Sequence, residues 1–82
     1  MFATVITYGK RAVHVEHQIP IPAGWRVVGP DPYNSKPMKK GDKMLVSTPK
    51  QLKQEKFIWK LVPRWMVGRK AVITLLVIRK KK

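Results

Sequence analysis

The chain contains no cysteine, and only four of its 82 residues are acidic. The absence of cysteine excludes disulfides, thiolate nucleophiles, cysteine-based zinc sites and iron–sulfur clusters. The five glycines stand apart from one another, so the sequence has no glycine-rich phosphate loop. No run approaches the roughly 20 apolar residues that span a bilayer, and the N-terminus lacks the basic start of a signal peptide. The missing apolar span and signal sequence predict a cytoplasmic protein without a transmembrane segment, whereas the absence of cysteine says little about the compartment.

The scarcity of acids and histidines also argues against catalysis. Four scattered carboxylates and two histidines provide neither a paired acid and base nor a catalytic triad. His14-Val-Glu-His17 is the one cluster of metal-ligating residue types, but on a strand His17 points away from His14 and Glu16. We interpret both histidines as surface residues of an edge strand. We therefore expect no enzymatic activity, no metal or other cofactor, and no small-molecule substrate.

Basic residues are abundant and unevenly placed. Eighteen Lys and Arg against four acids give a net charge of +14. Residues 1–35 hold three bases and two acids, a net charge of +1, whereas residues 36–82 hold fifteen bases and two acids, a net charge of +13. Such a field favours a polyanionic partner, most commonly a phosphate backbone. An acidic protein or an anionic membrane would satisfy the same electrostatics, but no interfacial helix is evident, so the membrane ranks below nucleic acid.

Alternating apolar and β-branched residues predict a mainly β fold of five or six short strands. The expected strands cover residues 2–8, 12–16, 25–28, 43–47, 56–62 and 71–78. The turn at Gly9-Lys10-Arg11 predicts that the first two strands form a hairpin. Two prolines in residues 19–24 predict an extended connector that lays Ile19 and Ile21 on the core. The strands would form a small β-barrel or a curled antiparallel sheet.

The longest nearly continuous apolar run is residues 71–78, with the sequence AVITLLVI. It predicts a strand buried on both faces that forms the spine of the core. A chain of this length buries only about 60–65% of its unfolded surface, which leaves room for a single core. We expect one β-rich domain over residues 1–78 and a basic C-terminal tail over residues 79–82.

Residues 48–62 allow two interpretations. Thr48-Pro49-Lys50-Gln51 has the spacing of a capping box with proline at the first helical position, which predicts the start of a helix. Such a helix would continue along a partial apolar stripe to Val62, before Pro63 ends it. A short helix near residues 49–55 is also compatible with a strand after it. The alternative is a polar turn followed by a strand over residues 56–62, which places Phe57, Trp59 and Leu61 on one face. We favour the strand, because the apolar stripe of the helix is incomplete.

A sparse pattern of residues runs through most of positions 24–80. It comprises Gly24-Trp25-Arg26, Gly41-Asp42, Trp59, Gly68 and Arg79-Lys80. This layout resembles small tailed-phage proteins of unassigned activity with the pattern G-[YW]-R…G-D…W…G…R-[RK]. Such chains are often acidic around the Gly-Asp turn, whereas this one carries Lys39, Lys40 and Lys43. The resemblance implies a small β-rich viral domain in the host cytoplasm and carries over no function.

Cations interleaved with aromatic residues predict a nucleic-acid-binding surface, with phosphates held by Lys and Arg and bases stacked on exposed rings. The candidate residues are Lys39, Lys40, Lys43, Lys56, Lys60, Arg64, Trp65, Arg69, Lys70, Arg79, Lys80 and Tyr33. Trp65 and Tyr33 are the stacking candidates because they fall in expected loops, whereas Trp25 and Trp59 are expected in the core.

The first function that we expect is nucleic-acid binding, to DNA or RNA, with low sequence specificity. The alternative is a phage-encoded interaction protein that docks on an acidic host or virion protein and modulates it. A third option is a ribosomal or virion component whose basic face is buried in a particle. A homodimer through an exposed strand edge at Val13 and Val15 also stays open.

Overall fold

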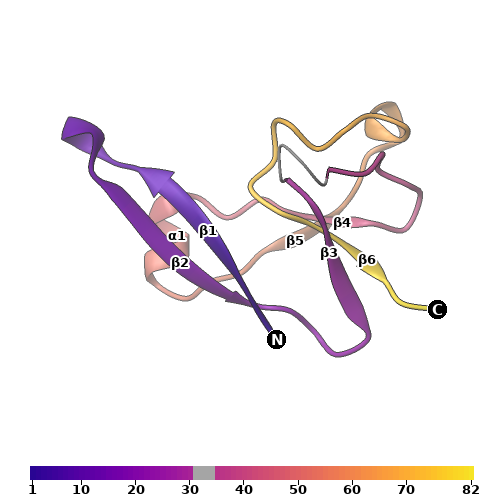
Figure 1. The fold of residues 1–82 in the computed structure, drawn as a ribbon, viewed down its shortest axis with the longest axis horizontal. Coiled ribbons are helices and arrows are strands. Elements are labelled where there is room, and N and C mark those ends of the chain that lie inside the picture. Colours follow the sequence, from indigo (N-terminus) through magenta and orange to yellow (C-terminus); the bar gives the residue numbers. More distant parts are fainter. Residues whose placement is uncertain (31–34) are drawn as a thin grey trace.

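A computed structural model describes residues 1–30 and 35–82. Within these residues six strands form two antiparallel sheets (Figure 1). The strands are β1 (Phe2–Tyr8), β2 (His14–Pro20), β3 (Trp25–Gly29), β4 (Lys43–Leu45), β5 (Trp59–Leu61) and β6 (Val77–Lys80). The helical elements are α1 (Pro49–Lys53) and the 3-10 turns η1 (Lys10–Ala12) and η2 (Arg64–Met66). The predicted mainly β class is confirmed, but the sheets stay open and form no barrel.

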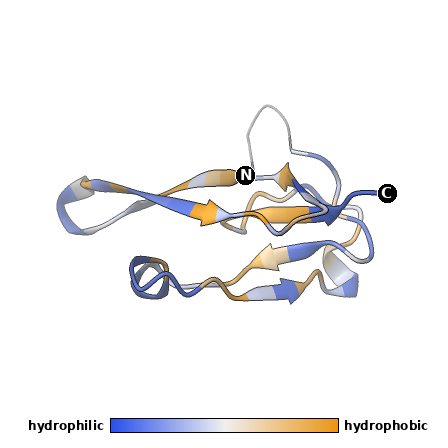
Figure 2. Cartoon of the chain, turned by 90° about the horizontal axis from the view of Figure 1, so that it is seen from below, coloured by the Kyte–Doolittle hydropathy of each residue, from blue (hydrophilic) through white to orange (hydrophobic). Residues whose placement is uncertain are grey.

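Strands β1 and β2 form the predicted hairpin, in a register that runs from Phe2 opposite Pro20 to Tyr8 opposite His14. Side chains alternate along β1 as expected, because residues on opposite sides of the pleat face the core and the solvent in turn. Val5 and Thr7 are buried, whereas Phe2, Ile6 and Tyr8 are exposed. Figures 1 and 2 show the hairpin extending beyond the four-stranded sheet and lying across from α1.

The second sheet has the order β3-β6-β4-β5, with neighbouring strands antiparallel. Its central strand β6 buries Val77 and Ile78 completely, on opposite faces of the sheet. Each face therefore packs against its own apolar cluster. Ile78 belongs to the cluster shared with the hairpin, and Val77 belongs to the cluster covered by η2 and the neighbouring loops.

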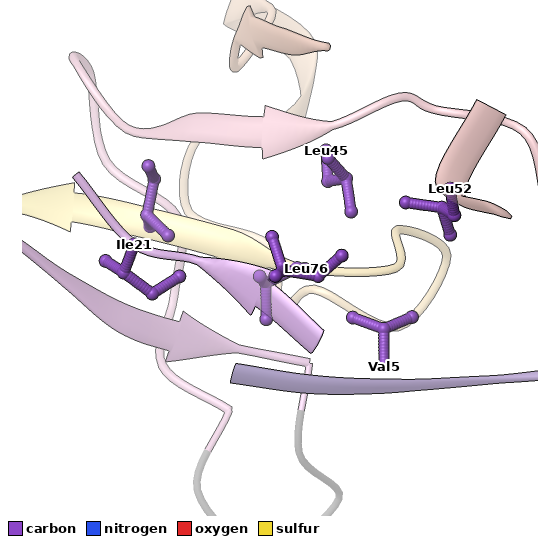
Figure 3. Packing of buried hydrophobic residues seen from close by; sticks show 7 residues of the cluster. Val5, Ile21, Leu45, Leu52 and Leu76 are labelled. Atoms are coloured by element: carbon purple, nitrogen blue, oxygen red, sulfur yellow. The ribbon is translucent and has the colours of Figure 1, made fainter. Parts of the chain in front are cut away.

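The cluster shared with the hairpin joins distant parts of the chain. In Figure 3, side chains from β1, the connector after β2, β4, α1 and the segment before β6 point toward one another. The labelled residues are Val5, Ile21, Leu45, Leu52 and Leu76. Trp25 and Trp59 pack against this cluster, which confirms their predicted place in the core. The buried positions of Ile19 and Ile21 confirm the predicted role of the connector.

The strand predicted over residues 71–78 is wrong for most of its length. Residues 72–75 form a bend, and β6 begins only at Val77 and continues through Lys80, into the predicted tail. Val72 and Ile73 are 78% and 72% exposed. The residues on either side of the bend belong to different apolar clusters. Ala71, before the bend, lies in the cluster covered by η2, and Leu76, after it, lies in the cluster shared with the hairpin. A continuous apolar run does not distinguish such a segment from a buried strand.

Two predictions about β2 also need correction. The strand continues to Pro20 rather than ending at Glu16, which an edge strand permits because the missing N–H points away from its partner. His14 is exposed as expected, but His17 is buried, with its Nε2 2.8 Å from Thr7 Oγ1. The strand also begins later than predicted, at His14, so Val13 lies before it and is exposed.

Residues 48–62 contain the expected short helix followed by the favoured strand, and no helix extends to Pro63. Thr48 Oγ1 accepts a hydrogen bond from Gln51 N, and Gln51 Oε1 accepts one from Thr48 N, which completes the capping box of α1. Strand β5 then covers Trp59–Leu61, shorter than the predicted strand over residues 56–62. The helix and the strand occur in succession because the capping box acts locally, whereas β5 depends on pairing with β4.

Candidate functional site

A cleft of about 730 Å³ lies between the turn that precedes β4 and the C-terminal end of β6. Its lining residues are Arg26, Lys39, Lys40, Gly41, Asp42, Arg79, Lys80, Lys81 and Lys82. Seven of these nine residues carry a positive charge, and Asp42 is the one acid among them. The cations come from β3, from the turn and from the C-terminal segment, so the fold assembles a basic site from three separate parts of the sequence.

Asp42 and Arg79 form an ion pair at the base of the cleft. Arg79 Nε donates to Asp42 Oδ1 over 3.0 Å, and Arg79 Nη2 donates to Asp42 Oδ2 over 3.1 Å. Arg79 Nη2 also donates to Pro37 O over 2.8 Å. Asp42 is 1% exposed, and such two-point contacts fix both partners in position. Arg79 therefore stabilises the fold at this site, and Asp42 offsets its charge within the cleft.

The turn that carries Lys39 and Lys40 is held closed by Asp42. Lys39 N donates to Asp42 Oδ2 over 2.8 Å, and Asp42 N donates to Lys39 O over 3.1 Å. Gly41 has a φ of 92°, a conformation that a side chain would strain. These constraints leave Lys39 and Lys40 exposed on a fixed loop at the rim of the cleft.

Two arginines face each other across the β3–β6 pair. Arg26 is the direct partner of Arg79 in the antiparallel register. Like charges in this arrangement destabilise a sheet, and Asp42 offsets only the charge of Arg79. Lys81 is held beside the start of β3, because its N donates a 2.6 Å hydrogen bond to Gly24 O. A bound anion would offset the remaining repulsion.

A second basic cluster surrounds η2. Trp65 is 61% exposed, and the guanidinium carbon of Arg69 lies 5.9 Å from the centre of its ring, within range of a cation–π contact. Arg64 and Lys70 are exposed nearby in the chain. This cluster confirms the predicted exposure of Trp65, although the residue lies on a 3-10 turn rather than in an irregular loop.

The two basic clusters lie on adjoining segments. Met38 N donates to Arg69 O over 2.8 Å, and Gly68 N donates to Met38 O over 2.7 Å. An isolated bridge pairs Pro37 with Lys70. The chain passes directly from this bridge into Lys39 and Lys40, so the cations around Trp65 adjoin the rim of the cleft.

The structure gathers most of the predicted site residues into these two clusters. The cleft contains Lys39, Lys40, Arg79 and Lys80, and the η2 cluster contains Arg64, Trp65, Arg69 and Lys70. Three of the predicted lysines belong to neither cluster. Lys43 is half-buried with its ammonium 4.9 Å from the ring of Trp25, and Lys56 and Lys60 are exposed near β5. Tyr33 lies outside the described residues.

Sequence reasoning missed two features of the cleft. Arg26 was not a candidate, because nothing in the sequence shows that β3 pairs with β6 and places Arg26 opposite Arg79. The structural role of Asp42 was also missed. Its position as the single acid in the run Lys39-Lys40-Gly41-Asp42-Lys43 was the available signal, since an isolated carboxylate among cations attracts an ion pair.

Metal-ligand clusters and membrane-spanning helices are absent from the part of the chain that the structure describes. There, no group of three or more His, Asp or Glu residues is placed to hold a metal ion. Over the same residues, no helix has the length and apolar character needed to cross a membrane. No protein-family model, curated protein or solved structure matches this chain.

Proposed function

We propose that this protein binds nucleic acid with low sequence specificity, and that it seats the phosphate backbone in the basic cleft. One observation carries the proposal: seven cations converge on the cleft, and its one acid among the described lining residues is already bonded to Arg79. Contacts to phosphate are mainly electrostatic and independent of sequence, so a cleft lined mainly by positive charge suits non-specific binding.

The η2 cluster extends this interface. An exposed indole beside cations is the arrangement by which proteins stack unpaired bases, a contact worth about 1–3 kcal/mol per base. Trp65 would stack a base while the adjoining Lys39 and Lys40 contact the phosphates. This division of roles favours single strands over duplexes, because the bases of a duplex are not free to stack on a side chain.

Fluorescence anisotropy tests the proposal directly. Labelled single-stranded DNA, duplex DNA and RNA are each titrated with the protein at low salt and at near-physiological salt. We expect dissociation constants on the order of micromolar at near-physiological salt, with the single strands bound most tightly. Binding that is equal for all three and disappears at near-physiological salt would reflect a basic surface without an interface, and would contradict the proposal.

A second candidate function is docking on an acidic protein, as expected for a small phage-type interaction protein. The observation that favours it is an exposed apolar patch beside the η2 cations. The patch consists of Trp65, Val72 and Ile73, which are exposed and line one pocket together with Arg69 and Lys70. Aromatic and arginine side chains dominate the binding energy of many protein interfaces. Affinity capture from a nuclease-treated lysate separates the two functions. One dominant acidic protein that is lost in an Ile73→Asp variant would favour docking, whereas recovery that depends on nucleic acid would favour the first function.

A further inference from the structure

The N-terminal hairpin presents an apolar surface that does not line the basic cleft. Phe2, Ile6 and Tyr8 are 67%, 47% and 75% exposed, and all three lie on the solvent face of β1. Residues 1–24 contain two bases and one acid, a net charge of +1. This part of the chain has the least charge to oppose the approach of another positively charged molecule.

The register of the hairpin shows which backbone groups face outward. Ile21 N donates to Met1 O and Gly9 N donates to Val13 O, each over 2.9 Å. Bonded and non-bonded pairs alternate in an antiparallel ladder, so the odd-numbered residues of β1 bond to β2. The N–H and C=O groups of the even-numbered residues therefore point to the outer edge.

The two outer edges of the hairpin differ. On the outer edge of β2, Pro20 has no N–H, which blunts that edge. On the outer edge of β1, all four outward residues keep both groups, and they are Phe2, Thr4, Ile6 and Tyr8. In the described part of the chain no strand pairs with this edge. The edge of β1 is thus an intact template for a further strand, flanked by apolar side chains.

We propose that β1 pairs antiparallel with β1 of a second copy of this chain, about a two-fold axis at Val5. Bonding between the two edges requires even-numbered residues to oppose each other. A register centred on Val5 places Phe2 opposite Tyr8 of the second copy and Thr4 opposite Ile6 of the second copy. All four outward residues of each strand then pair over the full length of β1. The product is a four-stranded sheet with the order β2-β1-β1-β2.

A second copy fits this edge better than another partner for two reasons. The pairing is self-complementary and closes on itself, so it removes the exposed edge without leading to a fibre. It also places Phe2 of one copy in cross-strand aromatic contact with Tyr8 of the other copy, at both ends of the paired β1 strands. Because the strands run in opposite directions, each hairpin tip lies toward the body of the other copy. The two strongly basic bodies are therefore kept at opposite ends of the shared sheet. This inference is independent of nucleic-acid binding.

A pair of proline variants tests which edge is used. Thr4 and Gln18 oppose each other, both are exposed, and Gln18 Nε2 donates to Thr4 Oγ1 over 3.1 Å. Thr4→Pro removes an outward N–H from the β1 edge, and Gln18→Pro removes one from the β2 edge. Each variant loses the same side-chain hydrogen bond, and a strand conformation tolerates proline at an outward position. Sedimentation velocity reports the oligomeric state, and circular dichroism confirms that both variants fold.

We expect the unmodified protein and the Gln18→Pro variant to be dimers at about 100 μM. The dissociation constant of the Thr4→Pro dimer should be at least about ten-fold higher, because the loss of a strand-edge hydrogen bond worth about 1.4 kcal/mol corresponds to a factor of ten. A monomeric unmodified protein, or equal weakening by the two prolines, would overturn the proposal.

A second test needs no proline. The chain has no cysteine, so Thr4→Cys and Ile6→Cys each provide a single thiol. The proposed register makes these two positions directly opposite in the dimer, at a Cα separation that a disulfide can bridge. Mild oxidation of an equal mixture should then yield mixed disulfides well above the statistical half. A statistical distribution, or an excess of either homodimer, would overturn the register.

Discussion

The hairpin of residues 1–24 and the body of residues 25–82 use their surfaces in opposite ways. The hairpin carries a net charge of +1 and exposes apolar side chains, whereas the body holds sixteen bases and three acids, a net charge of +13. Both depend on the same apolar cluster, to which the hairpin contributes Val5 and Ile19. The difference shows that two regions that share one apolar cluster carry very different surfaces, one strongly cationic and the other nearly neutral with exposed apolar side chains.

The largest difference in stability is expected between removal of a buried acid of the body and removal of an exposed acid of the hairpin. Asp42→Ala leaves Arg79 without its buried partner, and removing one member of such a pair costs about 3–5 kcal/mol. Glu16→Ala removes the exposed acid of the hairpin and should change the free energy of unfolding by less than about 0.5 kcal/mol. Urea denaturation followed by circular dichroism measures both variants. Similar stabilities of the two variants would show that the ion pair does not hold the cleft together.

One isoleucine on each face of the hairpin allows the contributions of the two faces to stability to be compared. Ile19 is completely buried, and Ile19→Ala should destabilise the fold by about 2–5 kcal/mol through the lost contacts and the cavity left behind. Ile6 lies on the solvent face, and Ile6→Ala should leave the stability of the dilute monomer within about 0.5 kcal/mol. Thermal unfolding at low concentration compares them. A large loss for Ile6→Ala in the monomer would mean that the outer face is packed.

Two exposed aromatic residues compare the regions as ligand surfaces. Trp65→Ala should weaken single-strand binding by about 1–3 kcal/mol, a factor of about 5–150, because a base loses its stacking partner. Duplex binding should change much less. Tyr8→Ala removes an aromatic ring of similar exposure from the hairpin and should not affect binding. Anisotropy titrations of both variants test this contrast, and equal losses would exclude specific stacking on Trp65.

The smallest effect is expected from the chain end. Lys81→Gln combined with Lys82→Gln removes two cations that line the cleft and leaves the bond from Lys81 N to Gly24 O in place. The slope of log affinity against log salt should fall by about 1–2, since each phosphate contact contributes about 0.7–0.9. Lys10→Gln with Arg11→Gln, at the hairpin tip, should leave the slope unchanged. Truncation from Arg79 is a poor test, because Arg79 and Lys80 belong to β6.

Local signals in the sequence predicted much of the fold. The alternation of β1, the hairpin turn and the capping box of α1 act over a few residues, and all are present. The interior of residues 71–78 was not predictable, because an apolar run is compatible with a strand and with a bend shared by two clusters. The burial of His17 depends on Thr7, ten residues earlier, a contact that follows only once the hairpin register is fixed.

Composition predicted the charge of the candidate site but not its shape. Lys39, Lys40, Arg79 and Lys80 were identified from their abundance of positive charge, and they line one cleft. Arg26 joins them through strand pairing between distant segments, which residue types alone do not specify. Lys43 was selected for the same charge, yet it lies over Trp25 in the fold. Charge thus predicted a basic surface, whereas topology determines which cations lie together.

The most direct test of the cleft compares two pairs of lysines of equal charge. Lys39→Gln with Lys40→Gln removes two cations from the rim of the cleft, and Lys50→Gln with Lys53→Gln removes two exposed cations from α1, which does not line it. Both variants have the same net charge. In anisotropy titrations of single-stranded DNA across salt concentrations, the cleft variant should lose about 1–2 from the salt slope and bind more weakly, while the α1 variant keeps both values near those of the unmodified protein. Equal losses in the two variants would contradict a defined interface and leave only the overall positive charge.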